Sequence, residues 1–196
     1  MLILALWQLF TMLVQLFAVF AVLFFMLLGV SLFLYYLLSL ISMIQSMIGG
    51  APFVPLEYSV AERMLELVEP KKGEVVYDLG CGDSRQLMLA SMRYGTKGVG
   101  VEIAWWPFLK SMVMRRMFGL QDEVKVYWKN IHDVSVQPAD IVFLYLFESV
   151  LGKIKGKLQK ELRPGTRIVS ARYKFPDWEP KLVEQGEKHP IYVYVV

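Results

Sequence analysis

A short run of glycine and acidic residues directly follows a stretch of apolar, β-branched residues. The run reads DLGCGD over residues 78–83, and a helical pattern begins two residues later. Gly80 and Gly82 let the backbone turn tightly and approach a ligand closely, because neither residue carries a Cβ atom. Asp78 and Asp83 add a carboxylate on each side of this loop. The residue types and their spacing predict a small-molecule site at the end of a strand.

The charge of the loop indicates what kind of ligand it binds. A dinucleotide-binding loop would need a third glycine at position 85, where this chain has arginine, so the G-x-G-x-x-G pattern fails. Two carboxylates would also repel a pyrophosphate at a helix N-terminus, where anions normally bind. They suit a cationic ligand instead. S-adenosylmethionine (SAM) carries a sulfonium and an ammonium group and no phosphate, so SAM is the expected cofactor.

Two further polar residues follow the next two apolar runs. Glu102 lies twenty residues after Gly82, and a carboxylate there can accept both hydroxyls of a ribose. Asn130 carries an amide that can donate to and accept from an adenine edge. Each residue alone is ordinary, but the ordered set is specific. The expected cofactor-binding residues are Asp78, Gly80, Gly82, Asp83, Glu102 and Asn130.

These residues must be positioned by alternating strands and helices. Hydrophobic periodicity predicts strands at 74–79, 98–103, 124–128, 140–146 and 166–175, and two more between 181 and 196. It predicts helices at 58–69, 85–93, 106–118 and 148–162. This order is typical of an α/β, Rossmann-like fold with a mostly parallel seven-stranded sheet and helices on both faces. Ligands of such sheets bind beyond the carboxyl ends of the strands, where the polar residues above are expected.

Residues 1–48 form a separate apolar block, which we interpret as a transmembrane segment. Only nine of these 48 residues are not apolar, and the first charged residue of the chain is Glu57. A helix of this length would measure about 72 Å, against about 30 Å for the hydrocarbon core of a bilayer. A secretory signal peptide is disfavoured because the apolar run is too long and no basic residue precedes it.

Two arrangements of this segment fit its length. One is a tilted helix that spans from about Trp7 to the Tyr35–Tyr36 pair, with residues 37–48 along the membrane surface. The other is a hairpin that turns near Gly29 and Ser31. The hairpin lacks polar turn residues, so the single span is preferred.

The polar residues around and within the segment suggest its orientation and its contacts. Every lysine and arginine follows the segment, which by the positive-inside tendency places the soluble domain on the cytoplasmic side of a membrane. Gln8, Thr11 and Gln15 fall on one helix face, which makes self-association in the bilayer a hypothesis. Three mildly polar residues near one interface are the equally simple interpretation.

Composition excludes several other classes. A net charge of +3 is too small for the clustered basic face of a nucleic-acid-binding protein. One cysteine and two histidines, in no ligand spacing, predict no metal site. Membrane lipid is the expected partner of the apolar segment.

The soluble part resembles a known family of enzymes. The stretches that carry the resemblance are APFVP (51–55), VVYDLGCGD (75–83), KLQKELRPGTRIVS (157–170) and FPDWEP (175–180). They are similar to the small protein-lysine methyltransferases of the class I SAM-dependent fold, which include archaeal broad-specificity enzymes and the mitochondrial ATP synthase c-subunit enzyme. The resemblance covers residues 51–196. Together with composition it predicts an anchor at 1–48, a hinge at 49–57 and a methyltransferase domain at 58–196.

The resemblance also implies a chemistry for the acceptor. A lysine acceptor must lose a proton at a pKa of about 10.4, so a carboxylate or a desolvating wall would help. Glu148 is the expected carboxylate, with Phe53, Tyr145 and Trp178 as walls around the acceptor. The simpler interpretations are a first-turn helix charge for Glu148 and a core anchor for Trp178.

Two departures from the family pattern keep other functions open. Ser84 replaces the last glycine of the loop, and Phe53 replaces a tyrosine. The predicted function is a membrane-anchored protein-lysine N-methyltransferase, and the resemblance implies that its substrate is a protein at the membrane. A methyltransferase that acts on a lipid or quinone is the near alternative, and a scaffold that binds SAM without turnover is the alternative from another class.

Overall fold

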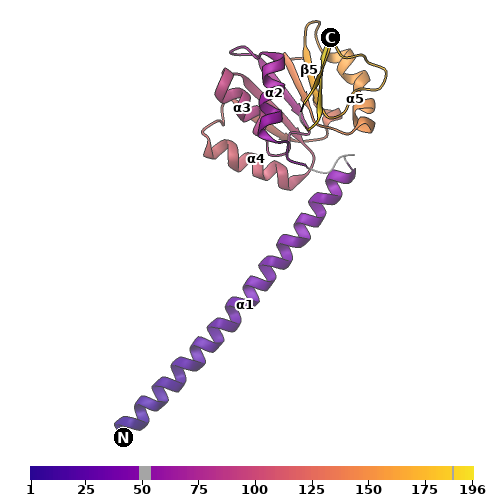
Figure 1. The fold of residues 1–196 in the computed structure, drawn as a ribbon. Coiled ribbons are helices and arrows are strands. Elements are labelled where there is room, and N and C mark those ends of the chain that lie inside the picture. Colours follow the sequence, from indigo (N-terminus) through magenta and orange to yellow (C-terminus); the bar gives the residue numbers. More distant parts are fainter. Residues whose placement is uncertain (49–53, 187) are drawn as a thin grey trace. The chain divides into compact units, whose positions relative to one another are not determined.

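The computed structural model describes residues 1–48, 54–186 and 188–196 of the 196-residue chain. The chain forms two compact units, Met1–Ile41 and Ser42–Val196. The first is part of one long helix, and the second holds a sheet with its covering helices (Figure 1).

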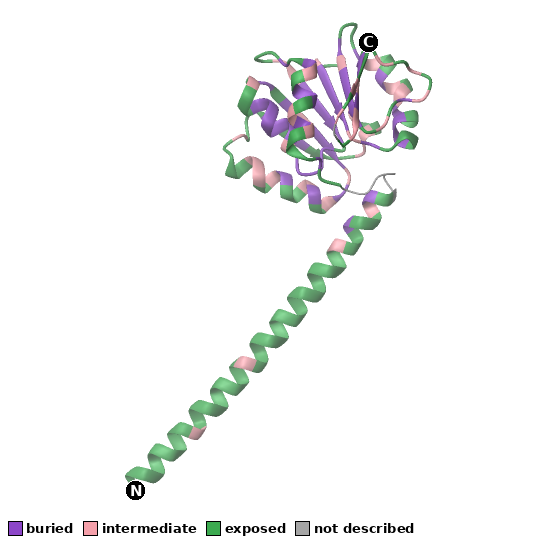
Figure 2. Ribbon diagram, in the orientation of Figure 1, coloured by how far each residue is buried: buried purple, intermediate pink, exposed green. Residues whose placement is uncertain are grey.

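The apolar N-terminal segment forms one continuous helix, α1, over Leu2–Ile48. Two of its polar side chains bond to its own backbone: the Thr11 hydroxyl donates to the carbonyl of Gln8 and the Ser31 hydroxyl to that of Leu27. Gly29 lies inside the helix, so the hairpin arrangement is absent from the structure. The side chains of the first unit are almost all exposed (Figure 2). By length and composition, α1 is the one described helix able to cross a membrane.

The second unit is built on a seven-stranded sheet in the order β3-β2-β1-β4-β5-β7-β6. The first five strands are parallel, and β7 runs antiparallel to both β5 and β6. The bounds are β1 Val75–Leu79, β2 Lys97–Glu102, β3 Val124–Trp128, β4 Ile141–Leu144, β5 Arg167–Ala171, β6 Leu182–Gln185 and β7 Pro190–Val195. The predicted mostly parallel sheet with helices is confirmed.

Helices cover both faces of this sheet, because the central strands are apolar on both sides. On β4, Ile141 and Phe143 pack into the cluster formed with α2, α3 and α4, while Val142 and Leu144 pack into the cluster formed with α5. The helices are α2 Tyr58–Val68, α3 Arg85–Tyr94, α4 Trp105–Met117 and α5 Glu148–Glu161, and a short 3₁₀ turn covers Ile131–Asp133. Figure 1 shows α5 on the side of the sheet opposite to α2 and α3.

Two predicted strands end earlier than the sequence indicated. The strand predicted at 166–175 ends at Ala171, because Arg172 adopts a positive φ of 74° and the Ser170 hydroxyl bonds to the carbonyl of Tyr173. The strand predicted at 140–146 ends at Leu144. The residues directly after β4, Tyr145 and Leu146, line the cavity described next.

Candidate active site

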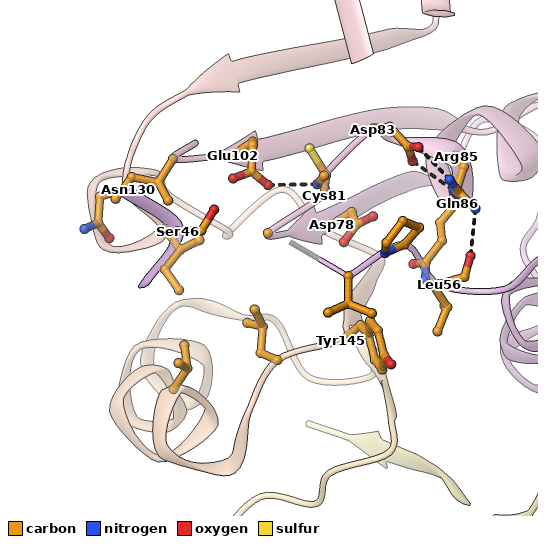
Figure 3. Close-up of a pocket in the computed structure, with 18 of the residues that line it drawn as sticks. Ser46, Leu56, Asp78, Cys81, Asp83, Arg85, Gln86, Glu102, Asn130 and Tyr145 are labelled. Atoms are coloured by element: carbon orange, nitrogen blue, oxygen red, sulfur yellow. Dashed lines mark hydrogen bonds and ion pairs between the residues drawn. The ribbon is translucent and has the colours of Figure 1, made fainter. Parts of the chain in front are cut away.

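A cavity of about 290 Å³ lies at the carboxyl ends of the central strands (Figure 3). Strand β1 lies between β2 and β4 here, so the chain order reverses at this point, which is the usual ligand site of an open α/β sheet. The residues that line it include Val54, Pro55, Leu56, Asp78, Gly80, Cys81, Gly82, Asp83, Arg85, Gln86, Glu102, Ile103, Asn130, Ile131, His132, Tyr145, Leu146, Val150 and Lys153. All six residues expected to bind the cofactor are therefore brought together.

The glycine loop takes the tight turn that its composition predicts. Gly80 has a φ of +85°, and a Cβ atom there would lie 2.9 Å from Cδ2 of Leu146. Gly82 also has a positive φ, of 55°. Ser84 is fully buried at a φ of +59°, in the left-handed region that glycine usually occupies. The backbone therefore keeps the turn of a glycine-rich loop at the position where serine replaces glycine.

Asp78 projects from the end of β1 and is 5% exposed. Burial raises the pKa of its carboxyl to about 8, and the charges of Glu102 and Asp83 add to this effect. Asp78 is therefore largely protonated at neutral pH in the protein without ligand. A cation placed beside it would favour the ionised form and lower this pKa again.

Glu102 supports the glycine loop from the end of β2. One carboxylate oxygen accepts a hydrogen bond from the backbone N–H of Gly82 at 2.8 Å, and the other accepts from the N–H of Ala104 at 2.8 Å. Burial raises the pKa of Glu102, although the backbone donors act in the opposite direction. Each oxygen keeps a second lone pair, so the carboxylate can still accept hydroxyl groups from a ligand.

Asp83 differs from the expectation of a free carboxylate facing a cation. It is 2% exposed and pairs with Arg85 at 2.6 Å and with Lys110 at 2.9 Å. Burial alone would raise the pKa of Asp83, but the hydrogen bonds from these two cations outweigh it and hold the pKa below its usual value. The charge of Asp83 is therefore met within the protein, and Asp78 is the carboxyl left to respond to a cationic ligand.

Asn130 follows β3 and lines the cavity with the 3₁₀ turn that it begins. Its side-chain oxygen accepts a hydrogen bond from the backbone N–H of His132 at 3.0 Å. The amide was expected to donate to a ligand and to accept from it. In the structure one lone pair of its oxygen is already used within the turn. The NH₂ group remains as the donor.

The four residues expected around the acceptor do not all meet at the cavity. Tyr145 lines it, whereas Glu148 and Trp178 are not among the described residues that do so. Glu148 is exposed on the first turn of α5. Trp178 packs against Phe175 and Tyr194, with ring centroids 5.1 Å and 5.3 Å away, which agrees with its simpler interpretation as a core residue. Phe53 lies outside the described residues.

Several lining residues had not been singled out for the site from the sequence, among them Arg85, Gln86 and Lys153. Arg85 was interpreted only as a departure from the dinucleotide-binding pattern, and Lys153 on α5 was assigned no role at the site. Gln86 is 5% exposed, and its Oε1 atom has no hydrogen-bond partner among the described residues. Its position in the first turn of the helix after the glycine loop was the available signal. A buried acceptor at the cavity wall is suited to a ligand that brings a donor.

Cys81 packs beneath the loop and takes no part in a recognisable catalytic group. A Cβ atom on Gly100 of β2 would lie 2.7 Å from its sulfur, so the thiol occupies the space that this glycine leaves. Burial raises the pKa of Cys81 well above its usual value, which makes the thiol unreactive. The described residues contain no group of three or more His, Cys, Asp or Glu side chains that could hold a metal ion.

Comparison with known proteins identifies what the chain is similar to. The ANTKMT methyltransferase domain family matches residues 78–182. A protein-lysine N-methyltransferase of Saccharolobus islandicus is 35% identical over 157 residues, which cover 78% of this chain and 98% of that protein. The ATP synthase c-subunit lysine N-methyltransferase of Rattus norvegicus is 27% identical over 66% of this chain. The chain spans 59% of the length of the rat enzyme.

One similar solved structure is also a methyltransferase. An RNA methyltransferase of Salinibacter ruber, crystallised with S-adenosyl-L-homocysteine, superposes with a TM-score of 0.71 at 32% identity. The match covers 72% of this chain and 93% of that protein. The match extends over most of the unit that holds the cavity.

Proposed function

Because the chain belongs to the ANTKMT methyltransferase domain family of SAM-dependent protein-lysine methyltransferases, we propose that it is a membrane-anchored enzyme that methylates a lysine ε-amine of a protein. The cavity at the carboxyl end of β1 carries this proposal, since it brings Asp78, Glu102 and Asn130 around one space. SAM supplies an activated methyl group, so the protein must align the acceptor and exclude water.

The polar groups of the cavity fit the groups of SAM. Asp78 and the unpaired Oε1 atom of Gln86 offer acceptors for the ammonium group. Glu102 has lone pairs left for the ribose hydroxyls, and Asn130 has an NH₂ group left for the adenine. We assign these residues to cofactor binding on this chemistry. Asp83 has a structural role instead, because its charge is already paired.

Tyr145 is the best candidate among the four acceptor residues. It follows β4, lines the cavity and stacks on His189 with ring centroids 6.5 Å apart. An aromatic wall suits a lysine, whose methylated forms are cationic and bind well over a ring face. Glu148 lies three residues later on the exposed start of α5, so we assign it to attracting the lysine ammonium rather than to proton removal within the cavity. Trp178 acts through packing.

The anchor is proposed from α1. Its 47 residues carry no charged side chain and almost all its side chains in Met1–Ile41 are exposed. An apolar surface of this size needs lipid or another partner to cover it. A signal sequence near the N-terminus would meet the same criteria of length and apolar composition. If α1 is an anchor, the positive-inside tendency places the enzyme domain on the cytoplasmic side.

Incubating the full-length chain with host membranes and SAM labelled in its methyl group tests this function. We expect the label in protein, and peptide mass spectrometry should locate it on lysine. A chain with Asp78→Asn serves as the matched control and should transfer little label. Label in the lipid extract or in RNA would overturn the lysine assignment, and no transfer by a chain that still binds SAM would indicate a scaffold.

A further inference from the structure

Helix α4 presents a row of apolar side chains to solvent. Leu109, Val113 and Met117 are 43%, 51% and 78% exposed, and their spacing of four residues puts them on one face. Phe118, directly after the helix, is 54% exposed and extends the row. Single exposed apolar residues are ordinary on a soluble protein, but a continuous row on one helix indicates a surface that contacts something apolar. We refer to these four residues as the α4 stripe.

The charges of α4 indicate what that contact is. The helix carries Lys110, Arg115 and Arg116 and no acidic residue. Helices α2 and α5 each carry acidic and basic side chains, whereas α3, like α4, carries only basic ones. Lys110 pairs with Asp83 and Arg115 donates to the carbonyl of Val124, so Arg116 is the exposed cation beside the row. An apolar row with an exposed cation beside it suits the interface of an anionic bilayer. A protein partner with an acidic rim would be the other match to this pattern.

Lipid is favoured because α4 begins beside the end of the apolar segment. Ala104, which precedes α4, makes no side-chain cap to the helix. Instead the hydroxyl of Ser42 accepts from the N–H of Trp106, and the side-chain oxygen of Gln45 accepts from the N–H of Trp105, both at 3.3 Å. All four residues belong to the same compact unit. The last turns of α1 therefore supply partners for N–H groups that a helix start leaves unpaired.

The short stretch of chain after α1 gives a second, independent reason to expect lipid near α4. Only residues 49–53 separate the end of α1 from the cavity-lining residue Val54. Even if this stretch were fully extended, it would separate the end of α1 from Val54 by only about 20 Å. If α1 spans a membrane, the enzyme domain is held against the membrane surface. A solvent-exposed apolar row on such a domain has lipid within reach.

We propose that α4 lies in the interfacial layer of the bilayer, with the α4 stripe against the lipid acyl chains and the exposed Arg116 at anionic headgroups. This inference rests on the membrane anchoring proposed above. Glu102 and Ile103 line the cavity directly before α4, so the docked helix holds the cavity near the membrane surface. The substrates that fit such an enzyme carry their acceptor lysine close to that surface.

Depth measurements on the full-length chain test the docking. Three variants, Val113→Cys, Met92→Cys and Phe24→Cys, are labelled with an environment-sensitive fluorophore and placed in nanodiscs of phosphatidylcholine and phosphatidylserine. Met92 on α3 is the matched control, since it is 53% exposed against 51% for Val113. The one native cysteine, Cys81, is 7% exposed, so the unmodified chain reports background labelling. Quenching by aqueous iodide is compared with quenching by spin-labelled lipid.

We expect the label at 113 to be quenched by lipid and to be at least about threefold less sensitive to iodide than the label at 92. Equal iodide quenching at 113 and 92, with the label at 24 in the hydrocarbon, would overturn the docking and keep the anchor. Shielding at 113 without lipid quenching would indicate a protein partner or a second copy and would also overturn it. A label at 24 outside the hydrocarbon would overturn the anchor and the docking together. None of these readouts depends on methyl transfer.

Discussion

Asp83 and Arg85 form a two-point ion pair across the junction of the glycine loop and α3. Nε of Arg85 donates to Oδ1 of Asp83 at 2.9 Å, and Nη2 donates to Oδ2 at 2.6 Å. Nη1 of the same guanidinium donates to the carbonyl of Leu56 at 3.0 Å, and the group lies 5.2 Å from the ring centroid of Tyr58. One side chain therefore joins the loop to the segment that precedes α2.

Replacing Arg85 should destabilise the domain. In the Arg85→Ala variant, Asp83 stays buried with Lys110 as its remaining partner, and we expect a loss of about 2 kcal/mol, or about 5 °C in Tm. Arg85→Lys is the matched control and should lose less, because it keeps the charge without the two-point geometry. Thermal unfolding in detergent measures both. An unchanged Tm in Arg85→Ala would show that the pair contributes nothing.

The effect of Arg85→Ala should also depend on pH. The pKa of Asp83 is lowered in the folded protein. The pair therefore stabilises the folded domain at pH values above the unfolded pKa of aspartate, which is about 3.9. This contribution is lost as the pH falls through the lower folded pKa. The Tm difference between the wild type and the variant should therefore persist at pH 7 and shrink below about pH 4.

Asp78 should couple SAM binding to the release of a proton. Its carboxyl titrates at about pH 8 without ligand, and a cation beside it favours ionisation. SAM affinity should rise between about pH 6.5 and 8.5, by at most about tenfold per pH unit, and a proton should be released on binding. Calorimetry in buffers of different ionisation enthalpy measures that release. Asp78→Asn should bind at least about tenfold more weakly and without this pH dependence, and unchanged binding would remove Asp78 from the site.

The raised pKa of Asp78 also predicts a stability change without ligand. Because the folded pKa of about 8 exceeds the unfolded value, the folded state loses stability as the pH rises through 8. Asp78→Asn avoids the buried charge and should exceed the wild type in Tm at pH 9, by about 3 °C or more, with a smaller difference at pH 6. Equal differences at both pH values would contradict the assigned titration.

Glu102→Gln should weaken the glycine loop and the cofactor site together. The two carboxylate oxygens accept from the N–H groups of Gly82 and Ala104, and an amide would face one of these donors with its own NH₂ group. We expect a loss of about 1–2 kcal/mol in stability and of about 100-fold in SAM affinity. Exposed Glu123, before β3, provides the control substitution Glu123→Gln. Wild-type SAM affinity in Glu102→Gln, measured by calorimetry, would exclude the ribose role.

Ser84→Gly should stabilise the domain. Ser84 has a φ of +59°, a conformation that costs a residue with a Cβ atom about 1 kcal/mol. Glycine removes this cost, whereas Ser84→Ala keeps it and loses only the contact between the hydroxyl and the sulfur of Cys81 at 3.3 Å. Tm should rise by about 2–4 °C in the glycine variant and not in the alanine variant. A fall in Tm for Ser84→Gly would mean that this contact outweighs the strain.

The sequence predicted the fold and most of the cavity because those signals are local. Apolar runs of β-branched residues fix the strands, and polar residues directly after those strands must gather at one edge of a parallel sheet. Asp78, Glu102 and Asn130 therefore lie together as expected. The family resemblance carried by four short stretches is confirmed by the match over residues 78–182.

Contacts between distant parts of the chain were decided only by the tertiary structure. Asp78 at the end of β1 and Asp83 in the loop after it have the same side chain. Among the described residues, folding buries Asp78 with no cation beside it and brings Arg85 and Lys110 to Asp83. Trp178 packs against the core beside Phe175 and Tyr194 and is not among the described residues that line the cavity. Charge type and periodicity are properties of a segment, so the sequence determined them. A pKa, an ion pair or an exposed face depends on which segments pack together, and the fold alone supplied that.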